Sequence, residues 1–502
     1  MATEYDESII LFGASGDLAK RKLYPSLFKL FLRGNLKNHF AIIGVSRTNW
    51  SDSEYQKIIK DILIRNENII NNKLFKFDLL DEFVKHCSYC PLDLTNHHNY
   101  INLKRKIQSK EKVFNIPSKR IFYLSIAPNL FSTVSNYLKS EQLLSNTGQN
   151  KLVIEKPFGT DYKSATHLND QLNEVFNENE IYRIDHYLGK EMVHNIQAVR
   201  FSNTIIESLW NNHYIDNIQI TLSEKIGIEN RANYYDKAGA LRDMVQSHIL
   251  QIAAQLAMDQ PVTFSDEDIR VEKVKALHAL RIYKDYEVNK YFVRGQYAAN
   301  NGCKAYRDEK NIPANSNTNT FVAGKLLFDN NRWLGVPFYI RTGKRLNDKF
   351  TRIDVTFKKP LIDLFNFTSN NYTHQNFLNP NILTIFVEPK YGFSLTLNTM
   401  TVKQEMNMKL SPINLNFYQD TITSNKFPDA YERLIHDILK GDQTNFASWK
   451  EISYSWKFID VIQKYWDKKE PIFPNYIPGS MGPASADELL KQDNRKWVYR
   501  IN

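Results

Sequence analysis

The chain has 502 residues, of which 42% are hydrophobic and 24% are charged, a globular composition that excludes wholesale disorder. Its length suggests roughly two to four domains. The formal net charge is +10, but the lysines are scattered along the chain, which favours a basic surface over a nucleic-acid-binding face. At the N-terminus, MATEYDESII carries acids where a signal peptide needs a basic region, and no window reaches the ~18 apolar residues of a membrane span. We therefore expect a cytoplasmic protein that binds neither nucleic acid nor membrane.

The first third of the chain alternates short apolar runs with helix-like segments. Helical patterns cover residues 24–34 and 53–66. The apolar runs, which we expect to be buried strands, are residues 8–13, 41–46, 120–127 and 151–156. Strand–helix alternation predicts βαβ units and a parallel sheet covered on both faces, as in Rossmann-like domains.

Later segments alternate with a period of two. In residues 217–224, isoleucine and leucine side chains fall on one face and Gln219, Thr221 and Ser223 on the other; residues 352–357 and 392–399 alternate in the same way. This pattern predicts antiparallel strands with one polar face, and the helical stretch 240–257 would cover the apolar face. We therefore predict a Rossmann-like domain over 1–184 and a larger α+β domain with a mostly antiparallel sheet over 185–502.

The chain has three cysteines, Cys87, Cys90 and Cys303, an odd and sparse set that is not a disulfide framework. Cys87 and Cys90 form a CxxC pair, but no second pair completes a zinc site, and His97 and His98 do not have finger spacing. We therefore expect no metal.

A glycine-rich turn follows the first expected strand. Its sequence, GASGDLA over residues 13–19, gives backbone N–H groups a close approach to a pyrophosphate at the start of a helix. We take Gly13, Ser15, Gly16, Asp17 and Leu18 as cofactor-binding residues, although the motif lacks the full GxGxxG pattern and a plain tight turn is the alternative.

The second expected strand ends at Ser46, followed by Arg47 and Thr48. In NAD-specific sheets an acidic residue usually stands at this place and holds the ribose 2′-hydroxyl. An arginine flanked by hydroxyls instead suits a 2′-phosphate, so the sequence favours NADP. The alternative is a solvated surface arginine.

Three segments combine groups suited to chemistry on a phosphorylated substrate. They are EKPFG at 155–159, RIDHYLGK at 183–190 and RDMVQSH at 242–248. The second places an acid, a histidine, a tyrosine and a lysine within a few residues, and imidazole, phenol and ammonium donors that converge would bind a phosphate.

Together these segments closely resemble the glucose-6-phosphate dehydrogenase family, whose active-site signature is RIDHYLGK. The resemblance spans almost the whole chain. Its other motifs are residues 13–28, 242–251, 332–346, 428–437 and 476–490. It implies oxidation of glucose 6-phosphate at C1 to 6-phosphogluconolactone, the first oxidative step of the pentose phosphate pathway, with NADP as hydride acceptor. The family forms dimers, sometimes tetramers, through the sheet of its second domain.

The resemblance also implies residue roles. His248 matches the base that removes the C1 hydroxyl proton, and Asp185 matches the acid that orients it, roles that suit an imidazole with a pKa near 7. Lys156 matches a residue that contacts both sugar and cofactor, and the neighbouring Pro157 positions it. Lys22 matches a lysine near the active site. The remaining substrate-binding matches are His186, Tyr187 and Lys190 for the phosphate, and Glu224, Asp243, Lys344 and Lys349 for the rest of the substrate.

Some observations leave alternatives open. His248 falls on an apolar helix stripe, so a buried core histidine is the competing interpretation. Ser247, Glu388 and Met481 replace an asparagine, a glutamine and a tryptophan of the usual pattern. Another sugar or sugar-phosphate dehydrogenase linked to NADP, or a catalytically dead relative that binds NADP, are the competing functions. The presence of RIDHYLGK and of Lys156, Asp185 and His248 argues against both.

Overall fold

The computed structural model describes residues 3–146, 149–300, 302–362, 378–402, 408–418 and 428–499. The chain forms two compact units. The first comprises Met1–Gly189, Val262–Arg270 and Pro428–Ser453, and the second comprises Lys190–Pro261, Val271–Phe427 and Tyr454–Asn502. Both units are thus assembled from separate stretches of chain, whereas the sequence patterns suggested one division in chain order, 1–184 and 185–502.

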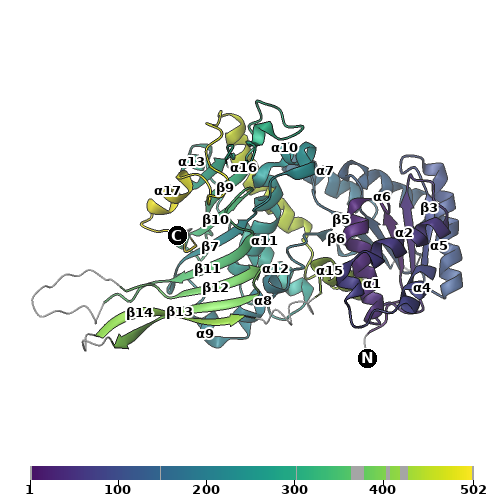
Figure 1. Cartoon of the computed structure of the whole chain (residues 1–502), viewed down its shortest axis with the longest axis horizontal. Coiled ribbons are helices and arrows are strands. Elements are labelled where there is room, and N and C mark those ends of the chain that lie inside the picture. The colour runs from purple at the N-terminus through teal and green to yellow at the C-terminus, as the bar shows by residue number, and fades with distance from the viewer. Residues whose placement is uncertain are drawn as a thin grey trace, which may run out of the picture. The chain divides into compact units, whose positions relative to one another are not determined.

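The first unit contains a six-stranded sheet in the order β3-β2-β1-β4-β5-β6, and all five pairings are parallel. Its central strand β1 is buried along its whole length, as its apolar residues require when helices cover both faces. Figure 1 shows those helices on either side of the sheet. This confirms the predicted Rossmann-like fold. The strands are β1 Ser8–Phe12, β2 Ala41–Ser46, β3 Cys87–Pro91, β4 Arg120–Leu124, β5 Asn150–Glu155 and β6 Ile181–Ile184.

Some helices of the first unit begin at local capping signals. Ser51 and Glu54 form a capping box at the start of α2, and Asp161 caps α7 in the same way. A late segment of the chain supplies α15, which packs on α1 and is held there by an ion pair between Arg33 and Glu432 of 2.8 Å. The helices are α1 Tyr24–Leu32, α2 Asp52–Ile64, α3 Glu67–Ile70, α4 Phe77–Lys85, α5 Tyr100–Phe114, α6 Phe131–Ser140, α7 Tyr162–Asn173 and α15 Ala430–Lys440.

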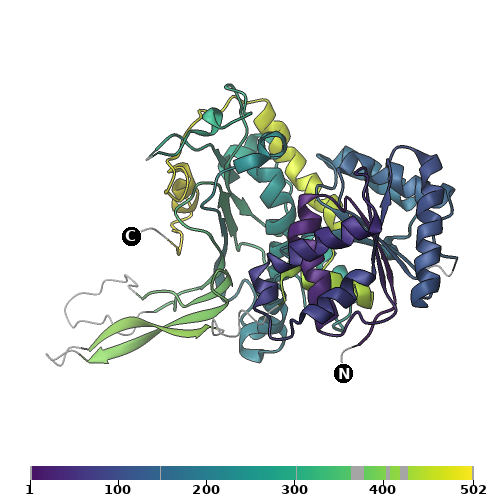
Figure 2. The same cartoon turned by 45° about the vertical axis from the view of Figure 1, so that its right-hand side comes forward.

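The second unit contains an eight-stranded sheet in the order β14-β13-β12-β11-β7-β10-β9-β8. All its pairings are antiparallel except that between β7 and β10, which confirms the predicted mostly antiparallel sheet. Figure 2 shows the β13–β14 hairpin extending from this sheet. The strands are β7 Ile215–Ser223, β8 Phe292–Gly295, β9 Phe321–Leu326, β10 Phe338–Gly343, β11 Phe350–Phe357, β12 Ile382–Glu388, β13 Gly392–Val402 and β14 Met408–Tyr418.

The prediction of one uncovered polar face is wrong for β7. Gln219, Thr221 and Ser223 are buried, as are the apolar side chains on the opposite face. The reason is that the C-terminal segment covers the polar face. The Gln219 side-chain amide donates to the Lys496 carbonyl at 2.9 Å, and its oxygen accepts from the backbone N–H of Val498 at 2.8 Å. A polar side chain can be buried at little cost when its hydrogen bonds are satisfied in this way.

The predicted helix over 240–257 is confirmed, but its first half is a π-helix, η6 Leu241–Ile249, which continues into α11 Leu250–Ala257.

No helix in the described part of the chain is long and apolar enough to cross a membrane. The chain passes between the units within α12 and α16. The other helices in this part of the chain are α8 Glu191–Phe201, α9 Thr204–Ser208, α10 Ala232–Ala240, α12 Asp266–His278, α13 Val288–Tyr291, α16 Trp449–Asp467 and α17 Ser485–Lys491.

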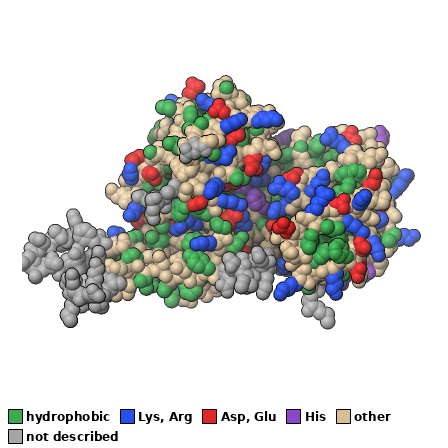
Figure 3. Space-filling model, in the orientation of Figure 1, with side chains coloured by type: hydrophobic (Ala, Val, Ile, Leu, Met, Phe, Trp, Pro, Cys, Tyr) green, Lys and Arg blue, Asp and Glu red, His purple; other side chains and the backbone are tan. Residues whose placement is uncertain are grey.

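Charged side chains of both signs share the face of the molecule drawn in Figure 3, and two of the cysteines are buried. On the face drawn in Figure 3, Lys and Arg side chains are interspersed with Asp and Glu side chains. Cys87 and Cys90 lie on β3, where residues three apart point to opposite faces of the sheet. Both are buried free thiols, and burial raises the pKa of each above its ordinary value.

Candidate active site

The glycine turn after β1 has the geometry that the motif predicts. Gly13 has a φ of +83°, and a Cβ at this position would lie 2.0 Å from the backbone oxygen of Ser125. Only glycine fits there. The backbone N–H of Gly16 donates to the Gly13 carbonyl at 2.9 Å, and a helix begins at Asp17, widens into the π-helix η1 Ala19–Leu23 and continues as α1. The turn therefore presents backbone N–H groups at a helix start, an arrangement that binds anions.

Arg47 directly follows β2 and is exposed. The residues on either side of it are fixed by Tyr89, whose hydroxyl hydrogen-bonds with the Ser46 hydroxyl at 2.6 Å and donates to the Thr48 carbonyl at 2.8 Å. The backbone at the end of β2 is therefore held firmly while the guanidinium faces solvent.

Two neighbouring parallel strands deliver the next set of residues. Glu155 ends β5 and lies in register with Ile184 at the end of β6. Lys156 and Asp185 follow these strand ends directly, so they emerge together at the carboxyl edge of the sheet, where open α/β sheets bind ligands. The Lys156–Pro157 peptide bond is cis.

Glu155 is a titratable group that the sequence analysis did not assign to the site. Its carboxylate accepts a hydrogen bond from the Tyr123 hydroxyl at 2.7 Å. Burial raises the pKa of Glu155 to about 7, against the lowering effects of the Tyr123 and Tyr431 hydroxyls and of Lys156; the charge of Asp185 adds to the increase. Tyr431 comes from α15, far away in sequence, so no local pattern could have indicated this environment.

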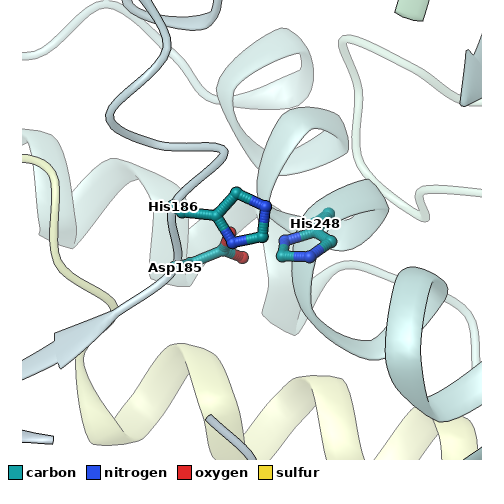
Figure 4. Close-up of side chains that lie close together, drawn as sticks. All are labelled: Asp185, His186 and His248. Atoms are coloured by element: carbon teal, nitrogen blue, oxygen red, sulfur yellow. The ribbon is translucent and has the colours of Figure 1, made fainter. Parts of the chain in front are cut away.

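The loop after β6 is folded around Asp185. This side chain is only 2% exposed, and its carboxylate accepts from the Tyr187 backbone N–H at 3.0 Å. The His186 ring stacks on that of Tyr431, with centroids 6.5 Å apart and planes 9° apart. The backbone of this loop therefore holds the Asp185 carboxylate, and Figure 4 labels Asp185 and His186 on the loop and His248 on η6.

Asp243 and His248 both belong to the π-helix η6 of the second unit, and His248 is only 1% exposed. Residues five apart on an α-helix point about 140° away from each other, because each turn takes 3.6 residues. A π-helix closes its turns with i→i+5 hydrogen bonds, so it brings such a pair towards one face. The Tyr234 hydroxyl, on α10, donates to the Asp243 carboxylate at 3.0 Å.

Glu224 and Lys344 are brought together by the only parallel pairing described in the second sheet. Ser223 at the end of β7 is in register with Gly343 at the end of β10, so the next residue of each strand lies at the same edge. The Lys344 ammonium contacts the Glu224 carboxylate at 2.6 Å, and it lies 5.3 Å from the centre of the Tyr235 ring.

Lys190 immediately precedes α8, and its ammonium forms an ion pair of 2.5 Å with Glu388 at the end of β12. Lys349 precedes β11 and acts electrostatically on the same carboxylate. In the first unit, Lys22 of η1 pairs with Asp429 at 2.9 Å. Several predicted site residues of each unit thus lie at strand ends or helix starts, whereas Asp243 and His248 lie within η6.

A parallel sheet with a glycine turn, and with a lysine, an acid and a histidine at its carboxyl edge, defines an oxidoreductase that binds a nicotinamide cofactor. Two family descriptions match the chain. "Glucose-6-phosphate dehydrogenase, NAD binding domain" matches residues 10–195, and "Glucose-6-phosphate dehydrogenase, C-terminal domain" matches residues 197–498. The chain belongs to the glucose-6-phosphate dehydrogenase family, which confirms the resemblance in the motifs.

Similar proteins match over their full length. The glucose-6-phosphate 1-dehydrogenase of Bacillus subtilis is 48% identical over 493 residues, 97% of each chain. That of Leuconostoc mesenteroides is 44% identical over 504 residues, all of both chains. A solved structure of a glucose-6-phosphate dehydrogenase in complex with its substrate glucose 6-phosphate has a TM-score of 0.87 at 32% identity, covering 99% of this chain and 100% of the other.

Proposed function

We propose that this protein oxidises glucose 6-phosphate at C1 to 6-phosphogluconolactone and passes the hydride to NADP. The observation that carries this proposal is the full-length family match, combined with a histidine on η6 and an acid, a histidine and a lysine at the carboxyl edge of the parallel sheet. In metabolism this reaction is the first oxidative step of the pentose phosphate pathway, and we expect it in the cytoplasm.

The glycine turn fits a dinucleotide, because its backbone N–H groups lie at a helix start, where a pyrophosphate binds, and because Gly13 lets the turn pass against the Ser125 carbonyl. In this proposal Ser15, Gly16, Asp17 and Leu18 hold the pyrophosphate together with Gly13. Arg47 binds the 2′-phosphate, which distinguishes NADP from NAD. NADP supplies the hydride acceptor when it is bound.

The proton chemistry belongs to His248 in this proposal. The neutral imidazole removes the C1 hydroxyl proton as the hydride leaves the carbon. Asp185 hydrogen-bonds to the other ring nitrogen, so it fixes the tautomer and stabilises the imidazolium that forms. Each of the two side chains is buried, and a charged group interacts more strongly with its neighbours in such an environment than in water.

The remaining site residues bind the sugar phosphate. We assign the phosphate to His186, Tyr187 and Lys190, because these side chains are hydrogen-bond donors. Glu224 and Asp243 accept hydrogen bonds from sugar hydroxyls. The lysines that complete the substrate site are Lys156, which also contacts the cofactor, Lys344 and Lys349.

We assign cofactor binding to residues 1–184 and substrate binding and dimerisation to residues 185–502. A homodimer, or a tetramer built from dimers, is supported by apolar side chains that strands β13 and β14 expose. These side chains are Met400, Ile413, Leu415, Phe417 and Tyr418.

One assay tests the proposed function. Purified protein should reduce NADP in the presence of glucose 6-phosphate, measured as an increase in absorbance at about 340 nm, the absorption of the reduced nicotinamide. Glucose should be a far poorer substrate, because the phosphate-binding residues would have no ligand. Absence of reduction with glucose 6-phosphate, using either NADP or NAD, would refute the proposal.

A further inference from the structure

The ion pair between Lys190 and Glu388 joins residues 198 positions apart in sequence. The distance from Nζ of Lys190 to Oε1 of Glu388 is 2.5 Å. Its environment is intermediate, since 16% of the Lys190 side chain and 21% of the Glu388 side chain remain exposed. A ligand can therefore reach the pair, and yet the pair is sheltered enough for its charges to interact strongly.

The backbone places Glu388 beside further polar groups. Glu388 ends β12 in register with Thr351 of β11, whose hydroxyl donates to the same carboxylate at 3.2 Å. Burial raises the pKa of Glu388, but Lys190, Lys349 and Thr351 together outweigh it and the net pKa is lower than usual. The carboxylate is thus charged at neutral pH, with two lysines around it.

We propose that Glu388 is an internal competitor of the substrate phosphate, because it occupies the ammonium of Lys190 that a phosphate ester must contact. This inference rests on the proposed function, in which Lys190 binds the phosphate. It makes Glu388 a specificity-determining residue that weakens the affinity for phosphorylated sugars and leaves the affinity for neutral sugars unchanged.

The chemistry of the pair supports this role. An ammonium that already donates to a carboxylate must release or share that hydrogen bond when a phosphate oxygen arrives. The phosphate and the carboxylate are also both anions, so they repel each other when bound to the same lysine. A neutral hydroxymethyl group carries no such charge and does not compete for the ammonium.

Glu388→Gln tests the inference, because glutamine keeps the size of the side chain and one acceptor oxygen but removes its charge. We expect the KM for glucose 6-phosphate to fall by about 10-fold, the effect of roughly one charge-assisted hydrogen bond. The kcat, the KM for NADP and the KM for glucose should stay near their original values. The inhibition constant of inorganic phosphate, used as a probe competing with glucose 6-phosphate, should fall in parallel.

Two further variants serve as controls. Asp329→Asn removes a carboxylate from an exposed ion pair of the same 2.5 Å length, with Arg281 in the second unit, and should change none of these constants. Glu388→Asp keeps the charge, so its KM for glucose 6-phosphate should stay closer to the original value than that of Glu388→Gln.

An unchanged or increased KM for glucose 6-phosphate in Glu388→Gln, with an unchanged melting temperature, would overturn the inference and make Glu388 a residue that positions Lys190 for the substrate. If Glu388→Gln does not fold, a lowered KM for glucose 6-phosphate in Glu388→Asp, whose shorter side chain draws the carboxylate away from the Lys190 ammonium, supports competition, and an unchanged KM overturns it. Calorimetric titration with inorganic phosphate separates this result from failure of the proposed function. Tighter phosphate binding by Glu388→Gln would support competition even if the protein did not oxidise glucose 6-phosphate.

Discussion

Arg47 is the residue on which we base the choice between the two nicotinamide cofactors. Its exposed guanidinium follows β2, where an acid would repel a 2′-phosphate. Loss of a charge-assisted hydrogen bond costs about 1.5–3 kcal/mol, so Arg47→Ala should weaken NADP binding roughly 10- to 150-fold. The binding of NAD, which has no 2′-phosphate, should change much less. Titration of both cofactors into the variant measures this difference.

Arg105→Ala is a matched control, because it removes an exposed arginine from α5 of the same unit. It should leave the affinities for both cofactors unchanged. Equal losses for NADP and NAD in Arg47→Ala would show that Arg47 does not contact the 2′-phosphate.

Single residues differ in how far a sequence can predict their roles. Lys156 and Asp185 were identified from motifs, and their places at adjacent strand ends follow from the predicted parallel sheet. The ion pair of Lys190 with Glu388 and the contact of Glu155 with Tyr431 depend on segments hundreds of residues apart. Local patterns carry no information about such long-range contacts.

At the scale of elements, the turn between β1 and the following helix is the most constrained. Gly13→Ala would place a methyl group against the Ser125 carbonyl at a backbone φ that favours glycine. We expect either a shifted turn with NADP affinity reduced at least 10-fold, or a melting temperature lowered by several degrees. Cofactor titration and thermal unfolding of the same preparation measure both effects.

Gly34→Ala is a control for the clash with the Ser125 carbonyl, because it introduces a similar backbone strain without that clash. Gly34 has a similar φ of +79°, but its Cβ would meet only the end of the flexible Lys37 side chain, at 3.1 Å. This variant should lose stability modestly and keep its NADP affinity. If Gly13→Ala were as stable as Gly34→Ala and bound NADP with the same affinity, the proposed role of the turn would be contradicted.

Element types were predictable from periodicity, but their surroundings were not. The buried strands β1, β2, β4 and β5 appear where apolar runs indicated them. The alternation in β7 correctly predicts a strand, and yet its polar face is buried because the C-terminal segment satisfies the hydrogen bonds of Gln219. The π geometry of η6 also escaped prediction, since its sequence has ordinary helical periodicity.

The stability of the whole molecule should respond to the titration of Glu155. Its folded-state pKa of about 7 lies above the ordinary value of 4.5, so the folded protein holds this proton more tightly than the unfolded chain. The resulting stabilisation is complete below about pH 4.5 and is lost as the pH rises towards 7. Glu155→Gln lacks this loss, because its amide does not ionise.

Relative to the original protein, the free energy of unfolding of Glu155→Gln should therefore increase between pH 5 and pH 8, by up to about 3 kcal/mol. Denaturant unfolding at the two pH values measures this change. A difference between the two proteins that is the same at both pH values would mean that Glu155 does not titrate in this range.

The central claim about the molecule is that His248 is the general base, and the competing view makes it a packed core residue. General-base catalysis contributes roughly 10²–10⁴-fold, so His248→Asn should lower kcat by about that factor and change KM far less. Asp185→Asn should also lower kcat, and the two losses should not add, since the pair acts as a unit. The most direct test is to measure kcat and melting temperature on one preparation of His248→Asn. We predict a large fall in kcat with a melting temperature near that of the original protein, whereas a well-folded variant with near-normal kcat would contradict the account.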